Sequence, residues 1–246
     1  EGRGSEHGGV YLDIAWIKEK IKDSETHIKK KLPSMYHQFM ELAGVDITKE
    51  KMEVGPTTHY VMGGIRVDAE TQMTTVEGLF ACGECAAGLH GANRLGGNSL
   101  SDLLVFGKRA GAHSAKFATD TTSFGTIDPK EVDDLVTVAL EPVDRTEGEN
   151  PYKIQQDLQE TMQDLVGISR NEEGLQKAID LIHGYAERAK NAHAPGNREY
   201  NPGWHTALDL HNLLTVSEAL CLSAIQRDES RGGHFREEYP EKTKEG

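Results

Sequence analysis

The sequence predicts an α/β plus all-α fold, and three observations lead to it. Residues 56–118 run from apolar stretches through glycine-bearing loops into one long helical pattern. The order strand, glycine-bearing loop, helix is typical of nucleotide-binding sheets. From Tyr152 onward, apolar residues recur at helical spacing in three successive stripes. The length of 246 residues exceeds the usual size of one domain, so we expect two domains.

Charge and composition argue against several classes of function. Lys and Arg number 27 against 40 Asp and Glu, a formal net charge of −13. This argues against nucleic-acid binding and against adhesion to anionic lipid through a basic face. No apolar run approaches the roughly eighteen residues of a membrane span, so we expect no direct membrane insertion. Three cysteines are too few for a disulfide framework, which favours a reducing compartment.

Residues 1–55 predict a small α+β piece. After a glycine-rich start, the alternation in Val10–Ile14 favours a short strand. Lys29–Ala43 places apolar side chains on one helical stripe, with Pro33 early in the run and Gly44 as the C-cap. The chain starts without a methionine in what resembles a loop, so we expect it to begin inside a longer protein.

Residues 56–118 hold the predicted strands and the predicted long helix. Tyr60–Asp68 has the pattern strand, glycine kink, strand, and Gly78–Gly83 is a short apolar strand ending in glycine. The helix Ser99–Ala118 keeps one face apolar and small. That inner face comprises Leu103, Leu104, Gly107, Ala110, Gly111 and Ala115. Residues 119–150, with clustered acids, threonines and two prolines, predict a connecting segment that is part helical at most.

Residues 151–246 predict a small helical bundle that could pack onto another domain, followed by a polar, irregular tail at Glu229–Arg236. Three apolar stripes define the helices, and the loop Ala194–Gly203 separates the second from the third. The stripes comprise Ile154, Leu158, Met162, Leu165 and Val166, then Leu175, Ala178, Ile179, Ile182 and Ala186, then Leu208, His211, Leu214, Ala219, Leu222 and Ile225.

The stretch His90–Leu100 concentrates groups that bind an anion. It places Arg94, amide and hydroxyl donors and the pair Gly96–Gly97 directly before the predicted helix. A helix N-terminus has unpaired N–H groups and partial positive charge, and glycine lets an outside group approach the backbone. Arginine can bind a carboxylate with two parallel hydrogen bonds, so Arg94 is a candidate for binding an anionic ligand. The alternative is an arginine in a surface or structural salt bridge.

Three further side chains near this stretch are candidates for ligand binding. His59 could donate a hydrogen bond to a substrate carboxylate, or it could be a satisfied histidine at a strand start. The same two options are open for His90. Glu84 follows a strand directly, where acids of nucleotide-binding sheets often accept from ribose hydroxyls. The alternative for Glu84 is a solvated loop carboxylate.

Cysteine spacing favours free thiols over a metal site. Cys82 and Cys85 have the C-x-x-C spacing of a zinc half-site or a redox pair, but a second pair is absent and Cys221 is far away. We therefore expect both to be free and partly buried. The sequence contains no nucleophile elbow, no Walker loop and no G-x-G-x-x-G after a strand. A nucleotide-binding sheet without its phosphate-binding loop is half a domain.

Several motifs resemble those of the succinate dehydrogenase and fumarate reductase flavoproteins. Three lie at Thr58–Ile65, Gly78–Glu84 and His90–Leu100. Glu1–Gly4 resembles a segment of the same family's capping domain, and Glu229–Pro240 is similar to its C-terminal helical region. The resemblance spans nearly the whole chain in collinear order.

The resemblance implies the C-terminal part of a longer flavoprotein. The fold would be the second half of an FAD-binding α/β domain with a remnant of an α+β capping domain, followed by a helical bundle domain. Residues 1–55 would be the end of the capping domain, and residues 56–118 would complete the FAD-binding domain. Residues 119–150 would be a connecting segment that leads to the helical domain, residues 151–246. The family's proton-shuttle arginine would lie upstream. We therefore expect no catalytic residue in this chain and no activity of the chain alone.

The resemblance also implies roles for individual residues. His59 and Arg94 match the family's ligands of the substrate carboxylates, the substrate being succinate or fumarate. The residues that would face the FAD are Glu84, Asn98, Ser99 and Leu100. Electrons would leave through an iron–sulfur subunit, and membrane anchor subunits would hold the protein at the cytoplasmic face of the membrane.

The run Ala87–His90 departs from the usual dehydrogenase pattern, which has an extra residue and a valine at this point. It is more similar to L-aspartate oxidase, a flavoenzyme that oxidises aspartate to iminoaspartate. Met62, Leu95–Gly97 and Phe235–Pro240 are similar to the dehydrogenase, which we therefore prefer. A non-catalytic folded fragment is the remaining alternative.

Overall fold

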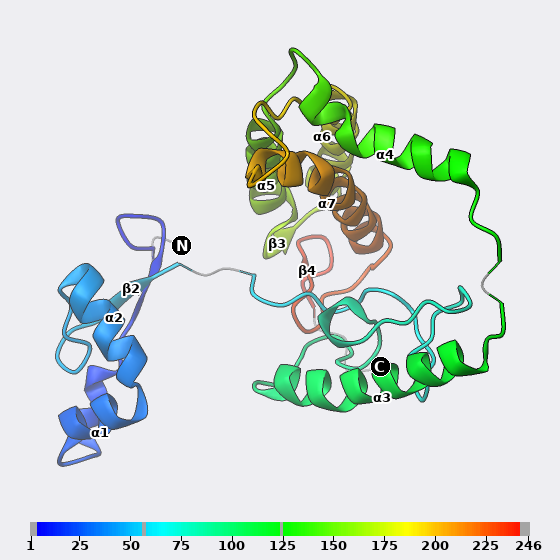
Figure 1. The fold of residues 1–246 in the computed structure, drawn as a ribbon. Coiled ribbons are helices and arrows are strands. Elements are labelled where there is room, and N and C mark those ends of the chain that lie inside the picture. Colours follow the sequence, from blue (N-terminus) through cyan, green and yellow to red (C-terminus); the bar gives the residue numbers. More distant parts are fainter. Residues whose placement is uncertain (1–3, 56–57, 124, 242–246) are drawn as a thin grey trace. The chain divides into compact units, whose positions relative to one another are not determined.

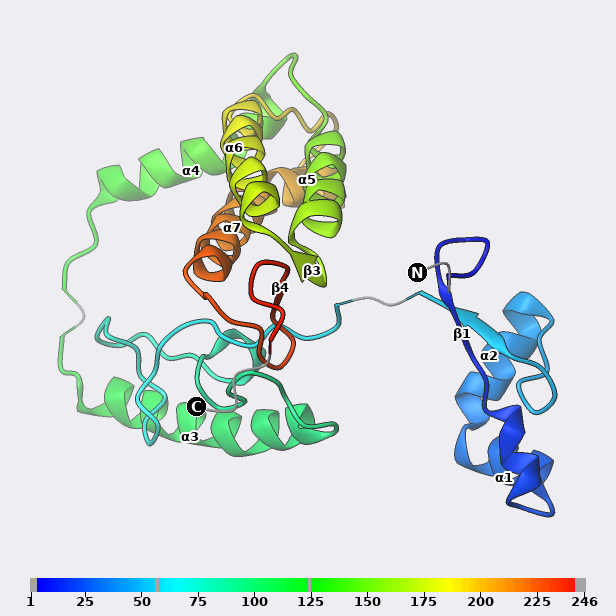
Figure 2. The ribbon, with the colours of Figure 1, turned by 180° about the vertical axis from the view of Figure 1, so that it is seen from behind.

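The computed structural model describes residues 4–55, 58–123 and 125–241. The chain forms two compact units, Glu1–Thr58 and His59–Gly246, and each is described by itself. Figure 1 shows the elements in chain order, and Figure 2 shows them from behind. Helices dominate, and the strands of the described residues form two-stranded sheets.

The first unit joins a two-stranded sheet to a pair of helices (Figure 1). β1 (Val10–Leu12) pairs antiparallel with β2 (Met52–Val54). Between them in the sequence lie the 3-10 helix η1 (Ala15–Glu19), α1 (Ser24–Lys31) and α2 (Pro33–Ala43). The core of the unit comprises Ile28, Ile47 and Met52, with Met35, Tyr36 and Phe39 packed against them. The short strand predicted from Val10 is therefore confirmed.

A proline divides the helix that the sequence predicts over Lys29–Ala43. α1 ends at Lys31 and α2 begins at Pro33, so the prediction of one continuous helix is wrong. Proline has no N–H to donate and keeps the residue before it out of the helical conformation. The predicted C-cap is confirmed, since Gly44 has a φ of +67° and donates its N–H to the carbonyl oxygen of Met40 at 3.2 Å.

The strands predicted at Tyr60–Asp68 and Gly78–Gly83 do not form within the described part of the chain. The isolated bridges there join Ile65 to Ala86 and Met73 to Phe80. Ile65 donates its N–H to the carbonyl oxygen of Cys85 at 2.8 Å, and Ala87 donates to Ile65 at 2.8 Å. A strand needs a ladder of such bonds along its length, and the neighbouring segments supply one bridge each.

The helix predicted after the glycine pair is confirmed, but of its predicted inner face only Ala110 is buried among the described residues. α3 spans Asn98–Asp120, and Gly97 precedes it with a φ of +84°. Leu104, which we expected inside, is 76% exposed, whereas Asp102 and Ala110 are buried. Periodicity indicates which residues share a helix face, but whether that face is buried depends on the segments that pack against it. Among the described residues, little packs against the face that carries Leu104.

The segment between α3 and the bundle contains a complete helix. α4 spans Pro129–Asp144, and the Asp128 side chain caps it by accepting from the N–H of Lys130 at 2.9 Å. The expected partly helical segment is therefore confirmed. The helix begins at Pro129 because the Asp128 side chain satisfies an N–H of its first turn and Pro129 needs no hydrogen-bond acceptor there.

Three helices form the bundle predicted for the C-terminal part. α5 (Pro151–Val166), α6 (Glu172–Ala189) and α7 (Pro202–Ile225) pack on one another (Figures 1 and 2). Their shared core comprises Leu158, Val166, Leu175, Ala178, Ile179, Ile182, Leu214, Cys221 and Ala224. An asparagine side chain caps the start of each helix, namely Asn150, Asn171 and Asn201.

α7 is long and apolar enough to cross a membrane when only length and composition are considered. The expectation that no segment reaches that length and composition is therefore wrong for the described residues. The helix buries Leu214, Cys221 and Ala224 in the core of the bundle. A core helix of a globular protein can have the same length and composition, so this helix alone is weak evidence for a membrane span.

The C-terminal segment docks on the bundle in a regular way, so the expectation of an irregular tail at Glu229–Arg236 is wrong. β4 (Phe235–Arg236) pairs in parallel with β3 (Ser169–Arg170). Glu237 adds a side-chain contact, accepting from the hydroxyl of Ser169 at 2.7 Å. The tail is polar in composition, but its buried polar residues Ser230 and His234 are hydrogen-bonded within the chain, to the N–H of Arg236 and the guanidinium of Arg170.

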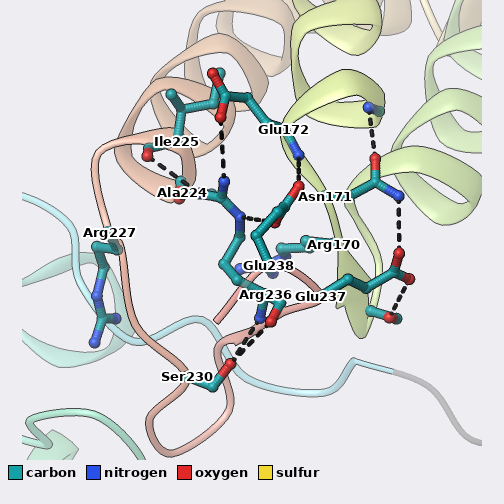
Figure 3. A network of polar contacts seen from close by, with 12 residues as sticks. Arg170, Asn171, Glu172, Ala224, Ile225, Arg227, Ser230, Arg236, Glu237 and Glu238 are labelled. Atoms are coloured by element: carbon teal, nitrogen blue, oxygen red, sulfur yellow. Dashed lines mark hydrogen bonds and ion pairs between the residues drawn. The ribbon is translucent and has the colours of Figure 1, made fainter. Parts of the chain in front are cut away.

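Arg236 is completely buried and joins two helix ends (Figure 3). Its Nη1 donates to the carbonyl oxygens of Ala224 at 2.9 Å and Ile225 at 3.1 Å, at the C-terminal end of α7. Its Nε donates to Glu238 Oε2 at 3.0 Å, and Glu238 Oε1 accepts the N–H of Glu172 at 2.6 Å at the start of α6. A cation thus lies at a helix C-terminus and a carboxylate at a helix N-terminus, which both helix dipoles favour.

Candidate functional site

Side chains of the three sequence motifs meet beside α3. Arg94 of the third motif lies over the ring of Tyr60 in the first, with 4.6 Å from its Cζ to the ring centroid. Glu84 of the second motif accepts the N–H of Val61 at 2.9 Å through Oε1. The structure therefore brings together the segments that carry His59, Glu84 and Arg94, although they are far apart in the sequence.

Arg94 has no carboxylate within salt-bridge distance among the described residues. Its Nη1 donates to the carbonyl oxygen of Leu95 at 3.4 Å, and its Nε is buried with no hydrogen-bond partner in that same part of the chain. A buried donor without a partner costs about 1–3 kcal/mol, so its retention requires an explanation. The salt-bridge alternative for Arg94 is therefore not what the structure shows, and the guanidinium is available to an anionic ligand.

The two candidate histidines have different surroundings. His59 is exposed, directly before Tyr60. The side chain of His90 is 12% exposed, its Nε2 lies 3.2 Å from Asp102 Oδ2, and its ring meets Tyr60 edge-on at 5.5 Å between centroids. His90 therefore has protein partners, which favours its structural interpretation, while His59 is accessible to a ligand.

The residues predicted to face the FAD lie on η2 (Gly83–Cys85) and in the first turn of α3. Glu84 is exposed, as are Asn98 and Leu100, and Ser99 is half-buried. Gly97 has no side chain to cap α3, and the first turn contains no acid. The partial positive charge of this helix end is therefore open to an anion.

Comparison with known proteins fits this arrangement. Residues 2–100 match the family model for an FAD binding domain, and residues 155–245 match the model for the fumarate reductase flavoprotein C-terminus. The chain belongs to the succinate dehydrogenase and fumarate reductase flavoprotein family. The cofactor of these flavoproteins is FAD, and the predicted fold class, part of an FAD-binding domain followed by a helical domain, is confirmed.

Relatives of this flavoprotein are much longer than the chain. It is 42% identical over 246 residues to an uncharacterized FAD-dependent oxidoreductase of Methanocaldococcus jannaschii, covering 100% of this chain and 42% of that protein. It is 34% identical to the succinate dehydrogenase flavoprotein subunit of Coxiella burnetii, covering 98% of the chain and 42% of that protein. The solved apo structure of Mycobacterium smegmatis Sdh1 is similar with a TM-score of 0.84 and 53% identity, over 98% of this chain and 40% of that one.

A loop of the helical part of this flavoprotein contacts the third motif. Gly233 donates its N–H to the carbonyl oxygen of Ala92 at 3.2 Å. A Cβ on Gly232, which has a φ of +62°, would lie 2.1 Å from that same oxygen, so only glycine fits there. Sequence reasoning missed this contact, because it treated the tail as irregular. The adjacent glycines were the available signal.

Cys82 and Cys85 are free, as predicted, and Cys221 is free as well. Cys82 is half-buried, but Cys85 is exposed, so the expected partial burial is wrong for Cys85. Burial raises the pKa of the Cys221 thiol to about 11, which makes it a poor nucleophile. Within the described ranges, no group of three or more His, Cys, Asp or Glu side chains could hold a metal ion.

Proposed function

We propose that this chain is the part of a succinate dehydrogenase or fumarate reductase flavoprotein that binds the carboxylates of the substrate and forms one wall of the flavin site. The observation that carries the proposal is Arg94, a half-buried cation with an unpartnered Nε and no carboxylate partner in the described chain. A dicarboxylate offers two acceptors. Arg94 would bind one carboxylate with two parallel hydrogen bonds, and His59 would donate to the other.

The open start of α3 fits the isoalloxazine system of FAD. Glu84, Asn98, Ser99 and Leu100 would hold the cofactor from this side. When bound, FAD supplies the acceptor for the hydride that leaves succinate. The uncapped N–H groups at the start of α3 would stabilise negative charge beside them, and binding both carboxylates would hold the reacting C–H bond in place. The proton-shuttle arginine would come from outside these 246 residues.

The proposal includes partner proteins and a location. Electrons would pass to an iron–sulfur subunit, and membrane anchor subunits would hold the assembly at the cytoplasmic face of the membrane. Several relatives are named as flavoprotein subunits, among them those of Coxiella burnetii and Haemophilus influenzae, and this supports a multi-subunit assembly. The net charge of −13 supports the absence of a nucleic-acid partner.

The test uses the complete protein that contains this chain, purified with FAD. Succinate oxidation with a dye acceptor, fumarate reduction with a reduced dye, and peroxide formation from aspartate are measured side by side. We expect turnover of succinate or fumarate and none of aspartate. Peroxide formation from aspartate without succinate turnover would assign the protein to the L-aspartate oxidases. A flavin-loaded protein that turns over none of the three would contradict the proposal.

A further inference from the structure

Asp102 is a buried carboxylate to which the proposed function assigns no role. Its side chain is 4% exposed and lies on α3. Its Oδ2 lies 3.2 Å from His90 Nε2 and accepts from the hydroxyl of Tyr60 at 3.5 Å. A carboxylate is stable in a buried position only when it is paired or hydrogen-bonded, so these contacts fix all three side chains together.

Tyr60 connects this carboxylate to Arg94. One face of its ring receives the guanidinium, with Arg94 Cζ 4.6 Å from the centroid, and His90 packs edge-on against the same ring. A planar guanidinium is attracted to the negative face of an aromatic ring. Burial raises the pKa of the Tyr60 hydroxyl, and the charges of Asp102 and Glu84 raise it further. The hydroxyl therefore stays protonated and can donate to Asp102.

We propose that Asp102 is a positioning residue for the substrate-binding arginine. It anchors His90 and Tyr60, and the ring of Tyr60 holds the guanidinium of Arg94 before a ligand arrives. This inference rests on the proposed role of Arg94 in binding a dicarboxylate. A long side chain ordered in advance loses less conformational freedom when the ligand binds, so the arrangement raises affinity without touching the substrate.

The experiment measures affinity for a dicarboxylate in the complete flavoprotein. The probe is malonate, which lacks the ethylene unit that the reaction would desaturate, and its Kd is determined by calorimetry beside the KM and kcat for succinate. Tyr60→Leu removes the ring, and we expect Kd and KM to rise about tenfold with a smaller change in kcat. Tyr60→Phe keeps the ring, so we expect a rise of at most about threefold. Asp102→Asn should resemble Tyr60→Leu.

The matched control is Asp120→Asn, an exposed acid at the other end of the same helix whose partner is Lys116. We expect its Kd and KM to equal those of the wild-type protein. FAD content and Tm of every variant separate misfolding from lost affinity. If Asp102→Asn does not fold, Asp102→Glu tests the carboxylate: it keeps the charge but moves it away from His90 and Tyr60, and we expect Kd and KM to rise. An Asp102→Glu variant with wild-type Kd and KM would then overturn the role of Asp102, and the comparison of Tyr60→Leu with Tyr60→Phe tests the ring.

Two outcomes would overturn the proposal. If Tyr60→Leu binds FAD and malonate as the wild-type protein does, the ring does not position Arg94. If the variants lower Tm but leave the Kd for malonate unchanged, the cluster is only structural. A wild-type protein that neither binds malonate nor turns over a dicarboxylate would remove the proposed function itself, a result that is distinct from the other two.

Discussion

The backbone N–H of Gly233 donates to the carbonyl oxygen of Ala92 at 3.2 Å, so the C-terminal loop rests on the motif that carries Arg94. Ala92 is two residues before Arg94 and two after His90. The contact joins backbone to backbone, and the missing side chain at Gly232 makes the approach possible. The helical part therefore supports the candidate ligand site from a distant point in the sequence.

Gly232→Ala should disturb this support. The new Cβ would lie 2.1 Å from a backbone oxygen at a φ of +62°, so either the loop or the third motif must move. We expect a loss of more than about 1 kcal/mol in the free energy of unfolding, together with faster hydrogen exchange at residues 90–94. Denaturant titration and hydrogen-exchange mass spectrometry of the complete protein measure the two effects.

The control for this variant is Gly44→Ala. Gly44 has nearly the same φ, +67°, with no atom within 4 Å of its added Cβ. It should show the backbone strain of about 1 kcal/mol without faster exchange at residues 90–94. Equal exchange at 90–94 in both variants would contradict the support that we assign to the loop.

Arg236→Met should destabilise the helical part strongly. The substitution keeps an unbranched side chain but leaves the carbonyl oxygens of Ala224 and Ile225 without the guanidinium donor and Glu238 without its cationic partner. We expect a loss of about 3 kcal/mol, measured by denaturant titration. Arg198→Met, which breaks an exposed ion pair with Asp144, should stay within about 0.5 kcal/mol of wild type. Similar losses in both variants would show that Arg236 is not a structural anchor.

His234 should make stability depend on pH. Its Nδ1 accepts from Arg170 at 3.0 Å and its Nε2 donates to the carbonyl oxygen of Arg227 at 3.3 Å, which requires the neutral ring. Burial lowers the pKa of His234 from 6.5, and the charges of Arg170, Arg227 and Arg236 lower it further. As pH falls below about 6.5, the ring binds a proton more readily in the unfolded protein than in the folded one. The free energy of unfolding therefore falls with pH.

This dependence can be measured as the urea midpoint at pH 7.5 and at pH 5.5. The wild-type protein should lose more stability between the two than His234→Gln, because glutamine does not titrate. His37→Gln, at an exposed position on α2, should keep the wild-type difference. A His234→Gln variant with the full wild-type difference would mean that other groups control the dependence.

Arg94→Lys tests the ligand role of the guanidinium. Lysine keeps the charge but cannot bind a carboxylate through two parallel hydrogen bonds. We expect the turnover of the complete enzyme with succinate or fumarate to fall at least about a hundredfold while FAD stays bound, measured by steady-state kinetics and flavin absorbance. Arg198→Lys, at an exposed ion pair, should leave turnover unchanged. Near-normal turnover of Arg94→Lys would remove Arg94 from the substrate site.

Local signals predicted much of the helical structure. Apolar stripes at helical spacing predicted α3 and the three bundle helices, and Gly44 predicted the end of α2, because a helix places these signals within a few residues of one another. The strands expected at Tyr60–Asp68 and Gly78–Gly83 failed for the opposite reason. A strand depends on a partner elsewhere, and the described segments beside these two supply isolated bridges instead of a ladder.

The sequence by itself determined the family, α3 and the three bundle helices, and it supplied the candidate ligands His59, Glu84 and Arg94, since residue type and motif order carry that information. Only the tertiary structure decided which residues support the motif that carries Arg94. The buried Asp102, the ring of Tyr60 and the loop at Gly233 come from segments separated by up to about 170 residues, and no local pattern links them. Tertiary contacts likewise decided the burial of Arg236, since its guanidinium donates to the carbonyl oxygens at the end of α7 and to the carboxylate of Glu238.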